Sequence, residues 1–268
     1  PASGFRKGEL LARAAAALEG SDGKKAEKLY RESLATAPSH LPALEGLARV
    51  LGRREKLTAQ EAQELVRLHF RHAKVDDDPA IKASAHVAAG DVLRDRLQLY
   101  EPARSQYELA LEHTPNSLEA LASLAELSYA AGDHKKAAKY FDRLAGSTQL
   151  SEDPARAAEL FWARGDCCLK LGFRERAVAS FREALRFRPG HIQALEDLGQ
   201  TLQEDGAWQA AKPVYEELVQ RTTPPKLKAA HQITLGTVLG KQNLLDAAVE
   251  QLQAGLEQLP KRFDAHLE

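Results

Sequence analysis

Cysteine and long apolar stretches are scarce in this sequence. Only two cysteines occur in 268 residues, Cys167 and Cys168, and because they are adjacent they build no disulfide framework, which makes a reducing compartment the default. No apolar run approaches the length of a membrane span, so we expect no direct membrane insertion. No secretory leader is present, although Pro1 is not a natural start. We therefore expect a cytoplasmic protein, or a periplasmic one if a leader was removed.

An excess of one charge and a high aromatic content are also missing. Lys and Arg total 37 against 38 Asp and Glu, for a net charge of −1, which argues against a polyanion-binding protein and so against nucleic acid. Two basic stretches, GRRE at 52–55 and RLHFRHAK at 67–74, are interpreted as solvated helix faces. Aromatic residues make up only 6% of the chain, so packing must come mainly from Ala and Leu, which suits helices.

Signatures of catalysis and of cofactor binding are absent as well. No phosphate-binding glycine loop and no Ser-His-Asp arrangement occurs. His69 and His72 share a helix face just before Asp76–Asp78, which makes a metal site conceivable, but a polar linker that caps the next helix is the favoured interpretation. Adjacent Cys167 and Cys168 point about 100° apart on a helix, so they are interpreted as small apolar residues and not as a redox pair. We therefore predict no active site, no metal and no cofactor.

The informative feature is a repeated order of small, aromatic, small and proline residues. The segment LGFRERAVASFREALRFRPG at 171–190 contains Gly172, Ala177, Phe181, Ala184 and Pro189. Similar sets recur elsewhere: Ala26, Tyr30, Leu34 and Pro38; Ala103, Tyr107, Ala110 and Pro115; Gly132, Ala137 and Phe141; Gly206, Ala211 and Tyr215; Ala248, Leu252 and Pro260. A period near 34 residues with these residue types resembles the tetratricopeptide repeat family.

That resemblance implies an all-α, right-handed superhelical solenoid of about seven helix-turn-helix repeats. In the repeats that carry it, a glycine in the first helix (helix A) is expected to permit a close helix contact, as at Gly165 and Gly199, whereas the first helix A lacks a Leu-Gly pair and the second repeat departs most from the pattern. The aromatic residue of the second helix (helix B) is expected to fill the gap between neighbouring repeats. The glycine between the helices is expected to be left-handed, and the final proline to end helix B.

The domain prediction is a single array over 1–268. Asp78-Pro79 and Asp153-Pro154 predict an N-cap followed by a first helical residue, and Pro225 marks a similar start, so every other helix A should be longer. Thr58 and Glu61 match a capping box, which predicts a helix start at Ala59. The expected repeats are 7–40, 41–78, 79–117, 118–153, 154–191, 192–224 and 225–262, with 263–268 as the start of a further helix or the end of the cloned piece.

The resemblance also implies a concave groove lined by the A helices. One subset of the family binds a partner's C-terminal carboxylate through a Lys and an Asn at two helix-A positions. The corresponding positions here hold Trp162 and Asp166 in one repeat and Glu196 and Gln200 in the next, so this carboxylate clamp is missing. Glu126, Asp166 and Glu196 are predicted to form one acidic strip beside Trp162, whose indole would serve as a partner anchor. The predicted groove residues are Glu45, Arg49, Asp91, Arg94, Glu119, Glu126, Tyr129, Glu159, Trp162, Asp166, Glu196, Gln200 and Gln203.

The function that follows is a non-catalytic scaffold for protein–protein interaction. The partner should be a protein or peptide segment with basic and apolar residues. By analogy with bacterial repeat scaffolds, it would belong to an envelope, secretion or motility assembly or be a small GTPase. The alternative is a recruiting domain of a larger enzyme, such as a glycosyltransferase or a signalling kinase. Self-association through the open end of the array is a third hypothesis.

Overall fold

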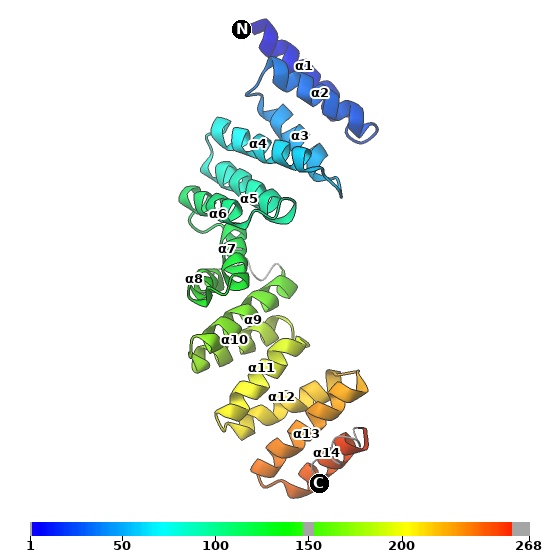
Figure 1. Ribbon diagram of the computed structural model, residues 1–268, viewed down its shortest axis with the longest axis vertical. Coiled ribbons are helices and arrows are strands. Elements are labelled where there is room, and N and C mark those ends of the chain that lie inside the picture. The colour runs from blue at the N-terminus through cyan, green and yellow to red at the C-terminus, as the bar shows by residue number, and fades with distance from the viewer. Residues whose placement is uncertain (1, 147–152, 259–268) are drawn as a thin grey trace. The chain divides into compact units, whose positions relative to one another are not determined.

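The computed structural model describes residues 2–146 and 153–258, which form helices and no strand (Figure 1). The chain divides into two compact units, unit 1 (Pro1–Leu127) and unit 2 (Ser128–Glu268). Within unit 1, consecutive helices from α1 to α6 pack on one another, and within unit 2 the same holds from α8 to α14. The all-α class predicted from the repeats is confirmed, whereas the expected start of a helix at 263–268 lies outside the described residues.

Fourteen helices are described, in seven consecutive pairs separated by short turns and linkers. We refer to the odd-numbered helices as A helices and to the even-numbered ones as B helices. Their bounds are α1 Ala2–Leu18, α2 Gly23–Thr36, α3 Leu41–Gly52, α4 Ala59–Val75, α5 Pro79–Asp95, α6 Tyr100–His113, α7 Leu118–Ala130, α8 His134–Ala145, α9 Pro154–Lys170, α10 Arg174–Phe187, α11 Ile192–Glu204, α12 Trp208–Arg221, α13 Pro225–Lys241 and α14 Leu245–Gln258.

Local sequence signals set several of the helix starts. The Thr58 side chain accepts from the Glu61 amide, and the Glu61 carboxylate accepts from the Thr58 amide, so the capping box is complete and α4 begins at Ala59 as predicted. Asp78 and Asp153 cap α5 and α9 through their carboxylates, each directly before a proline. The prediction that alternate A helices are longer is confirmed, since α5, α9 and α13 have 17 residues and α3, α7 and α11 have 12 or 13.

Left-handed residues connect the helices of several pairs. Gly132, Gly172 and Gly206 have φ values of 75°, 81° and 69°, as the repeat pattern predicted for the residue after helix A. In the turns after α5 and α13 the same role falls to Gln98 (φ 55°) and Asn243 (φ 61°). Asparagine tolerates this conformation, but glutamine is an uncommon choice, and the sequence pattern gave no sign of either.

Glycines of the A helices give room to large side chains of the B helices. A Cβ added at Gly165 would lie 2.5 Å from the Phe181 ring, and one added at Gly90 would lie 2.5 Å from the Tyr107 ring. Both glycines thus pack against the aromatic residue of their own helix pair. The aromatic residue was expected to fill the gap between neighbouring repeats, and at these two positions it also packs against the A helix of its own pair. Tyr30 is the exception, since it lies against Gly46 at the start of the next pair.

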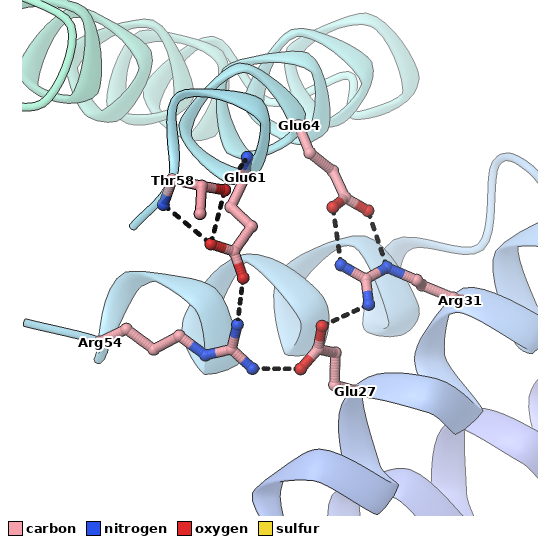
Figure 2. Close-up of polar contacts among 6 residues, drawn as sticks. All are labelled: Glu27, Arg31, Arg54, Thr58, Glu61 and Glu64. Atoms are coloured by element: carbon pink, nitrogen blue, oxygen red, sulfur yellow. Dashed lines mark hydrogen bonds and ion pairs between the residues drawn. The ribbon is translucent and has the colours of Figure 1, made fainter. Parts of the chain in front are cut away.

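A network of carboxylates and guanidinium groups joins the first two pairs of unit 1. The Arg31 guanidinium on α2 bonds both carboxylate oxygens of Glu64 on α4, with N···O distances of 2.9 and 2.7 Å (Figure 2). The buried Glu27 pairs with both Arg31 and Arg54, and Arg54 also donates to Glu61 at 2.6 Å. This network fixes the loop 53–58 against α2 and α4.

Candidate functional site

Two hollows flank α3 on unit 1. The larger, of about 700 Å³, lies between α3, α4 and α5, and its lining includes Ala48, Ala85 and Ala88. The smaller, of about 570 Å³, lies between α1, α2 and α3 and includes Phe5. Both volumes fall in the range of ordinary ligand pockets. Glu45 and Arg49 line both hollows, so these two predicted groove residues form the ridge between them.

The two charges of this ridge differ in how they are held. Arg49 donates to both carboxylate oxygens of Glu19 at 2.9 and 2.8 Å, and Tyr30 donates to the same carboxylate at 2.5 Å. The Arg49 hydrogen bonds lower the pKa of Glu19 to about 2, so this pair is fully ionised at neutral pH. Glu45 is exposed, and the His72 imidazole Nε2 lies 3.4 Å from its carboxylate.

The far wall of the larger hollow carries Asp91, another predicted groove residue. Its carboxylate accepts from the Tyr107 hydroxyl at 2.8 Å and lies 3.3 Å from the Arg94 guanidinium. Arg94 in turn bonds Asp95 and reaches Ser123, and lies 4.0 Å from Glu126. The remaining predicted residue of unit 1, Glu119, is exposed and accepts from the Ser117 hydroxyl at 3.2 Å.

In unit 2, hydrogen bonds join the end of α7 to α9 and join α9 to α11. The Tyr129 hydroxyl at the end of α7 donates to Asp166 of α9 at 2.7 Å, and Lys170 donates to the same carboxylate at 2.7 Å. The Lys170 ammonium also lies 5.3 Å from the Tyr129 ring centroid, within cation–π distance. Burial and the bond to Asp166 raise the pKa of Tyr129 above its usual value, so the phenol remains a donor.

Trp162 of α9 is held from two sides. Its indole N–H donates to Asp197 of α11 at 2.7 Å, and its ring stacks on His191 at a centroid distance of 6.0 Å. Burial raises the pKa of Asp197, although the Trp162 bond opposes that shift. The indole is partly buried and held from both sides, so it is a fixed platform. Glu159 lies on α9 three residues before Trp162. It is exposed, and its carboxylate lies 3.2 Å from the His191 imidazole.

The remaining predicted residues of unit 2 lie on α11. Glu196 lies 3.4 Å from the His231 imidazole of α13. Gln200 donates to Glu204 at 2.9 Å, and Gln203 accepts from the Tyr215 hydroxyl at 3.0 Å. Every one of these three side chains therefore already has a contact within the unit.

The three acids of the predicted acidic strip fall in two different units of the chain. Asp166 and Glu196 both belong to unit 2, on α9 and α11, whereas Glu126 belongs to unit 1. A strip that joins all three therefore stays a prediction. Sequence reasoning missed Asp197, which is the residue that orients Trp162. The repeat pattern assigns the inner face to Glu196. The one sequence signal for Asp197 was therefore that it stands directly after that residue.

The weak alternatives for chemistry receive no support among the described residues. No group of three or more His, Cys, Asp or Glu side chains there has the geometry of a metal site. Burial lowers the pKa of His69 to about 4, so this ring is neutral at pH 7. Cys167 and Cys168 are free and buried, and burial raises the pKa of both thiols, to about 12 for Cys167, which leaves them poor nucleophiles.

Comparison with known proteins identifies the family. The sequence pattern of the tetratricopeptide repeat matches residues 82–154 and 163–226, just over half of the chain. The chain therefore belongs to the tetratricopeptide repeat family, whose repeats are protein-interaction modules. Among curated proteins, none matches the sequence.

Solved structures share this fold at low sequence identity. The C-terminal part of a repeat-containing protein from Cytophaga hutchinsonii is 15% identical, with 97% of both chains covered and a TM-score of 0.60. YrrB, described as a tetratricopeptide protein with an unusual peptide-binding site, is 18% identical over 72% of this chain and 93% of its own, with a TM-score of 0.57. MamA is 19% identical over 69% and 96%, with a TM-score of 0.52. No helix among the described residues has the length and apolar character needed to cross a bilayer.

Proposed function

We propose that this chain is a non-catalytic scaffold that binds a segment of a partner protein along the exposed faces of its A helices. The family supports the general role, and the peptide-binding site described for YrrB supports a peptide-like ligand. The partner segment carries basic and apolar residues. The envelope, secretion or motility setting and the small GTPase suggested by the sequence stay proposals of the same kind.

The observation that carries this proposal is the charge around Trp162 in unit 2. The A helices α9 and α11 carry four carboxylates, one of which accepts from the indole. The lysine and arginine paired with them are Lys170 of α9 and Arg188, which lies 3.4 Å from Glu159, and the His191 and His231 imidazoles lie beside Glu159 and Glu196. This surface therefore retains a negative charge that attracts a cationic partner. The four carboxylates are Glu159, Asp166, Glu196 and Asp197.

The indole supplies the apolar part of the same surface. Because Asp197 and His191 fix the Trp162 ring before a ligand arrives, little side-chain freedom is lost on binding. Removing such an anchor typically costs 2 kcal/mol or more. We expect Trp162→Ala to weaken partner binding by about 2 kcal/mol for that reason.

The test starts from a partner captured with the full chain as bait and then purified. Titration calorimetry compares the parent with Trp162→Ala and Glu159→Lys at low and high salt, and Glu183→Lys on the B helix α10 serves as the charge-matched control. We expect both A-helix variants to weaken binding, salt to weaken the parent, and the control to bind like the parent. Equal binding by all proteins at both salt concentrations would show that the partner uses the B helices or the ends of the array.

A further inference from the structure

The larger hollow of unit 1 belongs to a different unit of the chain from the surface around Trp162. Part of its lining is apolar, because α3 contributes Ala48 and α5 contributes Ala85, Ala88 and Val92. Ile81 stands at the wall and leaves 37% of its surface exposed. Apolar surface of this kind favours an apolar side chain of a ligand.

The charges around the hollow decide which residue accompanies that apolar side chain. The one arginine in its lining is Arg49, and both carboxylate oxygens of Glu19 hold its guanidinium, so it offers no free cation to a ligand carboxylate. Glu45 keeps 48% of its side chain exposed, and among the ion pairs of the described residues it meets the His72 imidazole at 3.4 Å but no arginine or lysine. The ridge therefore presents a carboxylate to the ligand, and the complementary ligand group is a cation.

The second hollow extends the same surface across α3. It shares Glu45 and Arg49 with the first and carries the exposed Phe5 ring. A ligand that crosses α3 therefore meets apolar surface, then the Glu45 carboxylate, then apolar surface again. A helix is about 10 Å across, and an extended chain rises about 3.3 Å per residue. Side chains of an extended chain alternate between its two faces, so two apolar ligand residues about four positions apart, with the cation midway between them, would point to the same side and reach the two hollows.

We infer that unit 1 binds an extended partner segment with a lysine or arginine between two apolar residues, the cation on Glu45 and the apolar side chains in the hollows on either side of α3. This inference rests on the proposed function, because it requires a protein ligand. It goes beyond it in naming a second site, its residues and the order of residue types in the ligand.

The test uses a displayed library of random 12-residue peptides, selected on the full chain, and a synthetic copy of the most enriched peptide. Fluorescence anisotropy then measures the affinity of this peptide for the parent and for two variants of the site. Glu45→Lys reverses the charge of the ridge, and Ser84→Trp places a bulky side chain in the larger hollow from an exposed residue of its lining. Glu108→Lys and Ser105→Trp, both exposed on α6 and outside the hollow, are the matched controls.

We expect enriched peptides to carry a basic residue between apolar ones, and each site variant to lower the affinity at least tenfold while the controls change it less than twofold. Circular dichroism shows whether the variants keep the fold of the parent. Enrichment of no peptide, or of peptides without this order, would overturn the inference, and so would equal binding by the site variants. If Glu45→Lys binds the peptide normally but Trp162→Ala does not, the inference is wrong and the proposed function stands.

Discussion

Gly165 in α9 offers a direct measurement of how closely the helices of one pair approach. A Cβ added there would lie 2.5 Å from Cε1, 2.6 Å from Cδ1 and 3.0 Å from Cζ of Phe181. Ordinary carbon contacts lie at 3.5–4.0 Å, so the ring would have to move by about 1 Å. Phe181 is completely buried and part of the main core cluster of unit 2, which leaves the ring little room to move.

The magnitude follows from two opposing effects of Gly165→Ala. Replacing glycine by alanine inside a helix stabilises by about 1 kcal/mol, because the unfolded chain loses freedom. Overpacking a filled core costs about 1–3 kcal/mol. The matched control is Gly240→Ala in α13, where the added Cβ would meet its nearest atom, the Ala248 Cβ, at 4.0 Å, an ordinary contact. We expect the free energy of unfolding of Gly165→Ala to lie about 1–3 kcal/mol below that of Gly240→Ala.

The assay is equilibrium unfolding in urea, followed by circular dichroism. A second background with Phe181→Leu identifies the contact, because a smaller side chain removes the clash. In that background Gly165→Ala should cost less than in the parent, with a coupling of about 1 kcal/mol or more. If Gly165→Ala is as stable as Gly240→Ala in the parent background, the close approach of α9 and α10 is wrong, and so is the packing role assigned to this glycine.

Further predictions concern a histidine, a buried glutamate and the two cysteines. Burial holds the pKa of His69 near 4 in the folded state against 6.5 when unfolded, so the unfolded chain binds the extra proton and stability falls as the pH drops below 6.5. We expect a loss of about 2 kcal/mol between pH 7 and pH 5, visible as a lower thermal midpoint and smaller in His69→Leu; an unchanged pH dependence in the variant would refute this. Glu27→Gln should lower the free energy of unfolding by about 2 kcal/mol. This loss is smaller than is usual for breaking a buried ion pair, because Arg31 still pairs with Glu64 and Arg54 with Glu61. A cost within 0.5 kcal/mol in urea unfolding would mean that the network adds no stability. Replacing both Cys167 and Cys168 with Ala should leave partner binding intact and cost about 1 kcal/mol of stability for each lost thiol. Thiol-modifying reagents should react with the parent only as fast as it unfolds, and rapid labelling would show that the thiols are accessible.

The sequence alone determined the features that depend on neighbours within a few residues. The capping box of Thr58 and Glu61 acts over three residues, and the Asp-Pro pairs at 78–79 and 153–154 act at one helix start, so each could be recognised without knowledge of the fold. The repeat spacing likewise predicted the helix pairs and the close contact at Gly165, because the same residue types recur at the same intervals.

Only the tertiary structure decided which polar groups meet. Arg49 and Glu19 are 30 residues apart, and Trp162 and Asp197 are 35 apart, and the repeat pattern cannot say which of several neighbouring acids receives each donor. Side-chain direction on adjacent helices settles this, and a shift of one position, as between Glu196 and Asp197, changes the helix face by about 100°. The sequence thus predicted which positions of the A helices form a groove, and that stays a prediction, whereas packing between helices decided which charges at those positions are paired internally.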